Sequence, residues 1–287
     1  MVVTALEKAS ILVEALPYIK KFYGKTVVIK YGGSAMTDAQ LKKAVIEDIV
    51  LMRYVGMNPI VVHGGGPDIT HMLSRLNLES RFVDGYRVTS AAAMEVVEMV
   101  LVGKVNKDIV NYINAMGGKA VGLSGSDDHL ILATQMPGRD DLGYVGEVVD
   151  INPDLITTVI ERGYIPVISP VGVDANGQSY NINADLVAAA VATALNADKM
   201  VLLTDVPGLL ANPEDAESLI ATLPVSEVPG LIQQGVIAGG MLPKVECCLR
   251  AVKNGVKRTH IIDGRVLHSI LLEIFTNEGV GTMVVDE

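Results

Sequence analysis

The sequence predicts an α/β protein with an open, mainly parallel central sheet covered by helices on both faces. Short runs of β-branched residues alternate with amphipathic helical stretches along the whole chain, as in a parallel sheet with crossover helices. Several of these runs end in glycine-rich turns that lead directly into the next helical stretch. The alternation has no long linker and no fixed-period repeat. We therefore expect one continuous sheet in two lobes.

The predicted strands are short and apolar, which is typical of strands buried on both faces. They cover residues 26–30, 59–63, 164–168, 199–205, 258–263 and 281–285. The predicted helices carry apolar residues at helical spacing. They cover residues 4–22, 38–56, 67–77, 95–110 (as one helix or two), 183–195, 241–254 and 267–275. Residues 119–150 are rich in glycine and predict hairpins over the sheet edge, whereas the loop around 207–218 is the least regular part.

The first helix, residues 4–22, is not needed to cover the predicted sheet. Its apolar stripe consists of Leu6, Ala9, Val13 and Leu16. We expect Pro17 to bend or end this helix, because proline lacks an N–H group and its ring clashes with the preceding turn. Residues 1–24 are therefore a candidate extension or oligomer contact. A first lobe over 25–195 and a second lobe over 196–287 would follow it.

The composition excludes several classes of function. The 287 residues carry a formal net charge of −10, which disfavours nucleic acid and anionic membranes as partners. Aromatic residues make up 4% of the chain and tryptophan is absent, so base-stacking platforms are not expected. No stretch approaches the ~18 apolar residues of a membrane span, and the N-terminus lacks the features of a secretory signal. An anionic ligand would have to be held by a few local cations and by backbone N–H groups.

Cysteine and histidine usage predicts a cytoplasmic protein without a protein-held metal. The only two cysteines, Cys247 and Cys248, are adjacent, so neither a disulfide nor a CxxC pair is expected. We interpret them as small apolar residues of a helix. The five histidines show no tight spacing of the kind that metal ligands have.

Two glycine turns stand where predicted strands end. VIKYGGSAM (28–36) places Lys30 at the end of a strand, directly before Gly32 and Gly33, and VVHGGGPDI (61–69) repeats the arrangement with three glycines. Open parallel sheets bind ligands beyond the carboxyl ends of their strands. Glycine lets backbone N–H groups approach a phosphate, and the following helix presents its positive end. A lone glycine pair equally serves a plain tight turn, but two such turns with a lysine favour an anion site.

A third glycine pair precedes a lysine. AGGMLPKVE (238–246) puts Gly239 and Gly240 ahead of a helix whose first turn carries Lys244. A cation there opposes the helix dipole, and an anionic ligand would offset this cost. The alternative is an ordinary solvated lysine.

Polar residues also interrupt apolar surroundings in two places. YNINAD (180–185) leads with Asn181 and Asp185 into an alanine-rich helix, and VDGYRVT (83–89) places Arg87 after a glycine turn. Asp185 is suited to orienting two lysines, although a first-turn acid that only stabilises its helix is the alternative. The Arg87 guanidinium suits a carboxylate, and a surface ion pair is the alternative.

Together these residues predict phosphoryl transfer. The sequence holds no G-x-x-x-x-G-K-[ST] loop, no G-x-G-x-x-G turn after a strand and no G-x-S-x-G elbow. Two lysines and glycine amides are instead suited to neutralising a transferring phosphoryl group. No general base stands out, which suits an acceptor carboxylate that is already ionised near neutral pH. Mg²⁺ would then be carried by the nucleotide phosphates with few protein ligands.

At this level of detail the chain resembles the N-acetylglutamate kinases of the amino acid kinase family over essentially its full length. The motifs that carry the resemblance, in order, are VIKYGGSAM, VVHGGGPDI, VDGYRVT, EVVEMVLVGKVNKDIV, GYIPVISPVGV, YNINAD, LLTDVPGLL and AGGMLPKVE. The resemblance implies a three-layer α/β/α sandwich, with acetylglutamate binding and dimerisation in the first lobe and ATP binding in the second. It also implies ATP-dependent phosphorylation of the γ-carboxylate of acetylglutamate, the second step of arginine biosynthesis.

The resemblance assigns roles to individual residues. Lys30 and Lys244 match the lysines that stabilise the transferring group, and Asp185 matches the carboxylate that holds them. The residues implied for the substrate are Gly65, Gly66, Arg87 and Asn181, with Arg87 on the α-carboxylate and Asn181 on the acetamido side. The residues implied for ATP are Gly32, Gly33, Thr204, Asp205, Gly208, Leu209 and Gly240, and Gly33 and Gly66 would offer N–H groups to phosphates.

A narrower resemblance is to the arginine-inhibited, hexameric branch of these kinases. It is carried by EALPYIKKFYGK (14–25), HIIDGR (260–265) and LLEIFTNEGVGTMV (271–284). It implies a trimer of dimers with interlaced N-terminal helices, and an L-arginine effector site. The residues implied for this site are Tyr18, Lys199, His260, Glu273 and Gly279. Some members of this branch bind a PII signalling protein, which makes such a protein a candidate partner.

Two alternatives remain open at this stage. One is another amino acid kinase that acts on a related carboxylate, although aspartate kinases usually carry extra regulatory domains. The other is a catalytically weak arginine- or nitrogen-sensing scaffold, against which the presence of Lys30, Asp185 and Lys244 argues.

Overall fold

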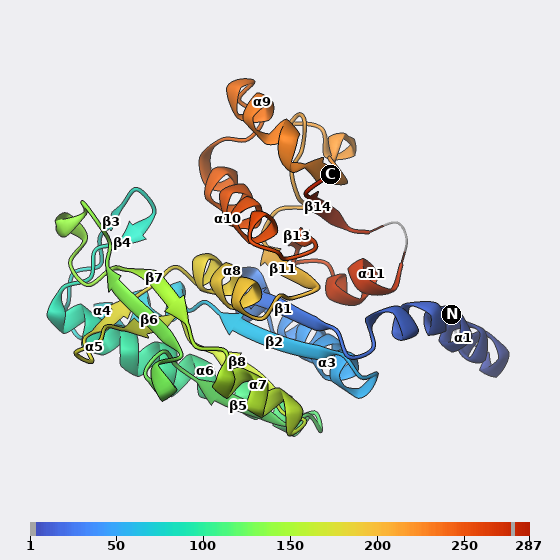
Figure 1. Ribbon diagram of the computed structural model, residues 1–287, viewed down its shortest axis with the longest axis horizontal. Helices are drawn as coiled ribbons and strands as arrows, with labels where there is room; N and C mark the ends of the chain where they lie inside the picture. The colour runs from blue at the N-terminus through green and yellow to red at the C-terminus, as the bar shows by residue number, and fades with distance from the viewer. Residues whose placement is uncertain (1–3, 277–278) are drawn as a thin grey trace.

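The centre of the molecule is an eight-stranded sheet (Figure 1). The structure is a computed structural model and describes residues 4–276 and 279–287. From one edge to the other, the strands are β12 (Thr222–Pro224), β14 (Gly281–Val285), β13 (Thr259–Asp263), β11 (Lys199–Thr204), β1 (Thr26–Tyr31), β2 (Asn58–His63), β8 (Ile165–Ile168) and β5 (Ala120–Leu123). All neighbours run parallel except β13 and β14, which pair antiparallel. The predicted open, mainly parallel sheet is therefore confirmed.

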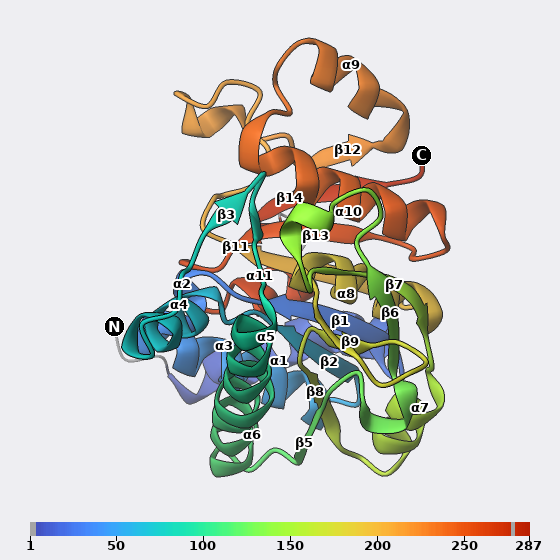
Figure 2. The ribbon, with the colours of Figure 1, turned by 90° about the vertical axis from the view of Figure 1, so that its left-hand side faces the viewer.

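Helices cover both faces of this sheet, so the three-layer α/β/α sandwich is confirmed. The helices are α1 (Ala5–Phe22), α2 (Ser34–Thr37), α3 (Ala39–Tyr54), α4 (Gly66–Arg75), α5 (Ala91–Glu98), α6 (Asn106–Ala115), α7 (Asp154–Glu161), α8 (Ala184–Ala194), α9 (Val228–Gln233), α10 (Leu242–Lys253) and α11 (Ser269–Phe275). Seen along the sheet, α3, α5 and α6 lie on one side of β1 and β2, and α7 and α8 on the other (Figure 2).

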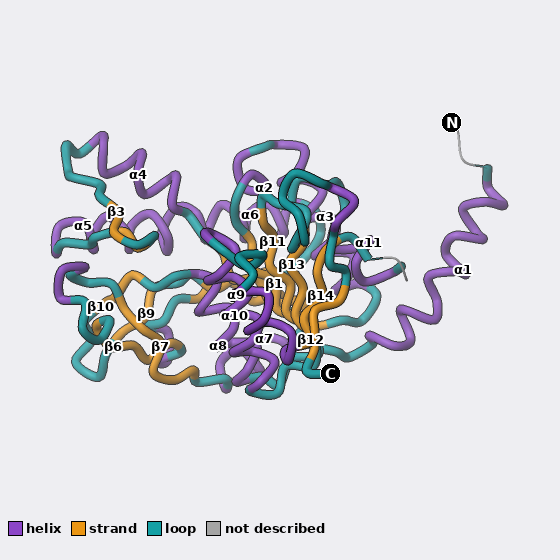
Figure 3. Tube along the Cα trace, turned by 90° about the horizontal axis from the view of Figure 1, so that it is seen from above, coloured by secondary structure: helices purple, strands orange, loops and turns teal. Residues whose placement is uncertain are grey.

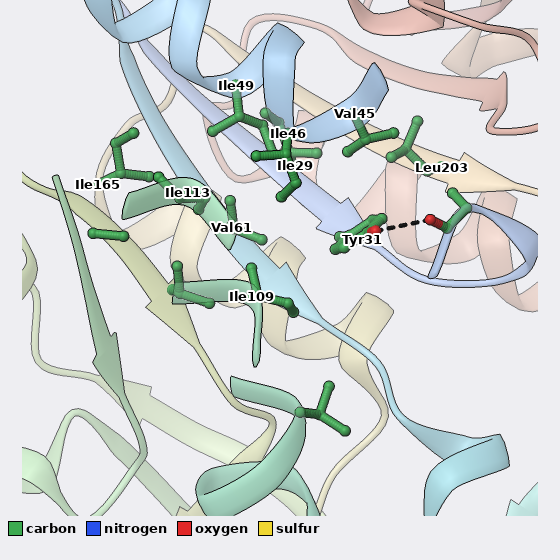
Figure 4. Close-up of a cluster of buried hydrophobic side chains, with 14 of the residues drawn as sticks. Ile29, Tyr31, Val45, Ile46, Ile49, Val61, Ile109, Ile113, Ile165 and Leu203 are labelled. Carbon is green, nitrogen blue, oxygen red and sulfur yellow. Dashed lines mark hydrogen bonds between the residues drawn. The ribbon is translucent and has the colours of Figure 1, made fainter. Parts of the chain in front are cut away.

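The core is divided by the sheet into two clusters. On β1, Val27, Ile29 and Tyr31 belong to one cluster, and Val28 belongs to the other. This alternation follows from strand geometry, since successive side chains point to opposite faces. Figure 4 shows part of the first cluster, where Ile29 lies among side chains of α3, α6 and the neighbouring strands.

The prediction of one continuous sheet is wrong, because part of the stretch 119–150 belongs to another sheet. Its first strand, β5, joins the main sheet at the edge, whereas its other two strands pair as an antiparallel hairpin, as predicted, and belong to a second, four-stranded sheet. That sheet has the order β10 (Ser179–Asn181), β9 (Val171–Val173), β6 (Ile131–Gln135) and β7 (Gly146–Ile151). A further pair is formed by β3 (Phe82–Val83) and β4 (Tyr86–Arg87). Short apolar runs do not reveal which partner strand they will choose, because pairing is decided by tertiary packing.

Two predicted helices also differ in the structure. Helix α1 does not end at Pro17, which lies inside it. The lost bond frees only the carbonyl of Val13, and this residue is exposed, so solvent can satisfy the carbonyl. The predicted helical stretch 95–110 is split by a π-helix, Met99–Val105, between α5 and α6. Helix α1 projects from the body of the molecule in both Figure 1 and Figure 3.

Candidate active site

Two glycine turns lie side by side at the carboxyl ends of β1 and β2. The strands pair in parallel with Tyr31 opposite His63, and the Gly64 N–H donates to the Tyr31 carbonyl at 2.8 Å. Gly33 has a φ of +67°, and a Cβ there would lie 2.6 Å from Oδ1 of Asp205. Glycine is therefore required for the close approach of Asp205, whose Oδ1 accepts the Ser34 N–H at 2.7 Å.

Three charged side chains from distant parts of the chain meet beside these turns. The carboxylate of Asp185, in the first turn of α8, lies 2.9 Å from Nζ of Lys30 and 3.5 Å from Nζ of Lys244. The side chains of Lys30, Asp185 and Lys244 are 14%, 13% and 26% exposed. We call these three residues the Lys–Asp–Lys cluster. The structure thus brings together the three residues predicted to be catalytic, and Lys244 is not a solvated surface lysine.

Asp185 is held ionised and in place by its neighbours. Burial alone would raise the pKa of its carboxyl, but the charges of Lys30 and Lys244 outweigh burial and hold the pKa below its usual range. The Asn183 side chain accepts the Asp185 N–H at 2.8 Å, and the Cys247 thiol donates to the Asp185 carbonyl at 2.9 Å. Cys247 lies in helix α10, as predicted, and is buried there, but its thiol also supports the cluster.

The Lys–Asp–Lys cluster lines a cavity of about 320 Å³. Glycines of both turns line this cavity. Its charged side chains come from both predicted lobes of the chain, because Lys244 belongs to the second lobe and the others belong to the first. The lining includes Lys30, Gly32, Gly33, Gly64, Gly65, Gly66, Asp68, Asn183, Asp185 and Lys244. The cavity therefore joins cations to turns whose N–H groups can reach an anion.

A second cavity of about 160 Å³ adjoins the first, because Gly64, Gly65, Gly66, Asn183 and Ala184 line both. Arg87 and Asn181 complete its polar lining. The Asn181 side chain donates to Oγ1 of Thr89 at 3.2 Å, which fixes the amide at the cavity wall. The second cavity therefore gathers the four residues that were predicted for the substrate.

Arg87 is a buried cation held by neutral groups. Its side chain donates to the Ser80 hydroxyl at 2.5 Å, the Gly66 carbonyl at 2.9 Å and the Thr70 hydroxyl at 2.8 Å. The residue is 6% exposed, and no carboxylate pairs with it in the part of the chain that the structure describes. Buried charges are normally paired, so this guanidinium is suited to an anionic ligand. The alternative of a surface ion pair for Arg87 is therefore wrong.

The supporting roles of Thr70 and Ser80 were not predicted. The first lies on α4 and the second follows it, and only the fold brings both to Arg87. A lone hydroxyl in the sequence carries no signal of such a role. Thr70 at least shares a helix face with Gly66, whose carbonyl accepts its hydroxyl hydrogen at 3.0 Å.

The residues predicted for the nucleotide lie in three places: Gly32 and Gly33 follow β1, Gly240 precedes α10, and the other four lie at the end of β11 and in the loop after it. The Thr204 hydroxyl contacts the Ile262 and Val206 carbonyls at 3.2 and 2.9 Å, and the Leu209 N–H donates to Thr282 at 2.8 Å. Leu209 is buried, and Gly208 has a φ of +142°. These groups shape the loop after β11. Gly240 lies in the 3-10 turn Gly239–Met241 before α10, four residues ahead of Lys244.

The five residues implied for an arginine effector also meet, at a separate place. Tyr18, Lys199, Glu273 and Gly279 line a cavity of about 270 Å³. His260 lies behind them, with Nδ1 2.8 Å from Oε1 of Glu273 and Nε2 3.2 Å from Nζ of Lys199. The motif 271–284 also includes residues 277–278, which lie outside the described residues.

Burial and ion pairing shift the pKa values of Lys199 and Glu273 at this cavity. Burial lowers the pKa of Lys199 to about 8, against the opposing pull of Glu273. Burial works against ionisation of Glu273, but the contact with His260 and the charge of Lys199 keep its pKa below the usual range. Gly279 has a φ of +65°, and a Cβ there would lie 3.2 Å from Oε2 of Glu273. The carboxylate and the ammonium are therefore fixed at one wall of the cavity.

Two absences apply to the described residues, 4–276 and 279–287. Within them, no three His, Cys, Asp or Glu side chains are grouped so as to hold a metal ion. None of the helices described there combines the length and the apolar character needed to cross a membrane.

The sequence is similar to those of known proteins. The chain fits the model of the amino acid kinase family over residues 25–263. It is 67% identical over 287 residues to a protein of Syntrophomonas wolfei subsp. wolfei named acetylglutamate kinase, and the match covers 100% of both chains. It is 63% identical over 294 residues to a protein of the same name from Moorella thermoacetica, covering 99% of each chain.

Solved structures agree on the fold. N-acetylglutamate synthase from Neisseria gonorrhoeae, complexed with coenzyme A and N-acetyl-glutamate, superposes with a TM-score of 0.85 at 24% identity, over 97% of this chain and 63% of that chain. Carbamate kinase from Giardia lamblia, bound to AMP-PNP, gives a TM-score of 0.69 at 19% identity, over 92% and 99% of the two chains. Together, the family model and the full-length relatives show that the chain belongs to the amino acid kinase family.

Proposed function

We propose that the chain transfers the γ-phosphoryl group of ATP to the γ-carboxylate of N-acetyl-L-glutamate, the second step of arginine biosynthesis. The observation that carries this proposal is the pair of adjoining cavities: one is lined by the Lys–Asp–Lys cluster and the other by a buried Arg87 that has no acidic partner among the described residues. The full-length relatives named acetylglutamate kinase support the same choice.

The chemistry needs charge neutralisation more than proton transfer. A carboxylate oxygen of the substrate forms a bond to the γ-phosphorus as the bond to the ADP oxygen breaks, and ADP leaves with the electron pair. The acceptor is already ionised, so no general base is required. Lys30 and Lys244 would neutralise the charge that spreads over the equatorial phosphoryl oxygens, while Asp185 keeps both ammonium groups in position. Mg²⁺ would arrive on the nucleotide phosphates, since the two carboxylates that line the cavity already pair with lysines: Asp185 with Lys30 and Lys244, and Asp68 with Lys104.

An ATP-dependent hydroxamate assay tests this function. Hydroxylamine traps the acyl phosphate product, and acetylglutamate, glutamate and aspartate are compared as acceptors. We expect turnover that is strongest with acetylglutamate. Preference for aspartate or glutamate would indicate another amino acid kinase, and no turnover with any acceptor would favour a sensing scaffold.

Arg87 provides a test of the substrate cavity. We expect Arg87→Ala to raise the KM for acetylglutamate strongly and to change the KM for ATP little, because the guanidinium faces the smaller cavity. The measurement is steady-state kinetics with each substrate varied in turn. Arg162→Ala, which removes an arginine at the end of α7, is the matched control. If ATP binding fails in Arg87→Ala instead, the assignment of the two lobes is reversed.

We also propose that L-arginine regulates the enzyme at the cavity lined by Tyr18, Lys199, Glu273 and Gly279. Glu273 would pair with the guanidinium of the effector, and Lys199 with its carboxylate. Helix α1 connects this cavity to other subunits in the proposed hexamer. Tyr18, near the end of α1, packs edge-on against Phe275 of α11 with ring centroids 6.5 Å apart.

The outer part of α1 supports the proposed trimer of dimers. Its apolar side chains face solvent in the single chain: Leu6, Ile11, Leu12, Val13 and Leu16 are 78%, 57%, 71%, 69% and 44% exposed. Burying each of them would contribute about 1.5–3 kcal/mol before the entropy of association is subtracted. With a net charge of −10 per chain, association must rest on such apolar burial.

Removal of residues 1–16 tests both proposals. This cut spares Tyr18 and the buried Phe22. We expect an active dimer in place of a hexamer, and loss of the coupling between arginine and activity. Light scattering and arginine titration on both chains provide the measurement, and Leu12→Glu in the full chain should reproduce the effect. A full-length dimer, or undiminished inhibition after truncation, would contradict the regulatory proposal and leave the kinase proposal standing.

A further inference from the structure

The second glycine turn is fixed by a buried histidine. His63 ends β2 and is fully buried, and its Nδ1 lies 2.7 Å from the carbonyl oxygen of Gly64. On the other side of the same glycine, the Gly64 N–H donates to the Tyr31 carbonyl. Both polar groups of Gly64 are therefore tied to the sheet, and neither is left to solvent.

The contacts of His63 define which ring nitrogen carries the hydrogen. The side-chain nitrogen of Asn106 lies 2.8 Å from the Val167 carbonyl and 3.2 Å from Nε2 of His63. A carbonyl only accepts hydrogen bonds, so the NH₂ group of Asn106 must face Val167. The same NH₂ group then donates to Nε2, which leaves the hydrogen on Nδ1, where it is donated to Gly64. Burial lowers the pKa of His63 to about 4, so the ring is neutral near pH 7.

This hydrogen bond sets the direction of the next N–H group. In a trans peptide the C=O and N–H bonds point in opposite directions, and no peptide of the described chain is cis. The Gly64 carbonyl points at the His63 ring, so the Gly65 N–H points away from it. Gly65 and Gly66 line both cavities of the active site, and in the part of the chain described here neither N–H group has a protein acceptor.

The π-helix supports the same turn from the other side. Asn106 follows directly after it, and a Cβ on Gly65 would lie 2.5 Å from Cδ2 of Leu101, a π-helix residue. Single π-turns inside α-helices frequently occur at functional sites. Here the π-helix places Asn106 beside His63 and the Leu101 side chain against Gly65.

We propose that His63 is a positioning residue for phosphoryl transfer: its Nδ1–H, oriented by Asn106, fixes the Gly64–Gly65 peptide so that the Gly65 N–H points away from the ring and stays free for an anionic ligand of the adjoining cavities. This inference rests on the proposed function, because phosphoryl transfer is the reaction that His63 would affect. It concerns a residue that lines neither of the two cavities and acts through the backbone of the turn.

Two substitutions in the full chain separate positioning from packing. His63→Leu fills the space without polar contacts, whereas His63→Asn keeps an N–H donor near the place of Nδ1. We expect His63→Leu to lower kcat about 10- to 100-fold with little change in the KM for ATP, and His63→Asn to recover most of the loss. His71→Leu, at an exposed histidine of α4, is the control. Equal losses of kcat in both His63 variants would overturn the proposal, because the presence of an N–H donor would then make no difference to catalysis.

The tautomer gives a second measurement that does not depend on activity or on the folding of a variant. Nitrogen-15 NMR of the wild-type chain at pH 7 should show His63 with hydrogen on Nδ1 and none on Nε2. Hydrogen on Nε2 would overturn the proposal. The spectrum needs no substrate, so failure of the proposed function, seen as no turnover of acetylglutamate, is distinguishable from failure of this inference.

Discussion

Replacing Lys244 by alanine should lower kcat by roughly two to three orders of magnitude while changing the KM for acetylglutamate little. The ammonium group lies 3.5 Å from Asp185 at the wall of the larger cavity, where a transferring phosphoryl group would develop its charge. An interaction that is stronger in the transition state than in the ground state affects kcat more than KM. Steady-state kinetics with each substrate varied in turn is the measurement.

Lys253→Ala is a matched control for this experiment. It removes the same charge from the same helix, at an exposed position in the last turn of α10. The control should keep the wild-type kcat, which would show that the position of the charge matters and not its effect on the helix. Near wild-type turnover of Lys244→Ala would remove this lysine from the mechanism.

Replacing Asp185 by asparagine should cost a similar factor in kcat, about two orders of magnitude or more. The amide keeps the shape of the side chain but removes the negative charge that lies between two partly buried ammonium groups. Without it, Lys30 and Lys244 repel each other and lose the geometry that phosphoryl transfer requires. The measurement is kcat at saturating ATP and acetylglutamate, with thermal melting to confirm that the variant is folded.

A second aspartate of the chain offers a control of the same kind. Asp198 also lies between two lysines, 2.6 Å from Lys257 and 3.8 Å from Lys25, but in another part of the molecule. Asp198→Asn should leave kcat unchanged. Equal losses in both variants would mean that the effect comes from general destabilisation, and not from the Lys–Asp–Lys cluster.

The parts of the site that depend on local chain geometry could be predicted from the sequence. A strand followed by glycines and a helix is a local pattern, so the turns after Lys30 and His63 were expected where they lie. The convergence of Lys30, Asp185 and Lys244 was one of two interpretations of the local sequence, and the resemblance assigned it. Asp185 and Lys244 lie in the first turns of helices, not at the carboxyl ends of neighbouring strands, so local patterns alone do not bring them together. The structure adds the distances that make the three residues one charged cluster.

Other features depend on contacts between distant segments and could not be predicted in this way. The partners of Arg87 come from α4 and the residues after it, and nothing in the local sequence of Ser80 indicates this contact. The choice of β6 and β7 to form a second sheet is likewise a result of tertiary packing. The π-helix before Asn106 has the composition of an ordinary helix, so its irregular turn has no sequence signal.

The cluster around Glu273 was expected on resemblance alone. Four of its five residues line one cavity and His260 contacts two of them, an arrangement that the resemblance required and that local patterns do not encode. Arginine binding, the hexamer and a PII partner stay predictions, and the truncation experiment addresses the first two.

The affinity for a mimic of the transition state tests the role of the Lys–Asp–Lys cluster most directly. Aluminium fluoride with ADP and acetylglutamate imitates the transferring phosphoryl group, and complexes of this kind bind more tightly than the ground state. We predict that Lys244→Ala and Asp185→Asn each weaken the ADP–aluminium fluoride complex by a factor close to their loss in kcat, while the Kd for ATP stays near that of the wild type. Equal weakening of both complexes, or no weakening of either, would contradict the proposal that these residues act on the transferring group.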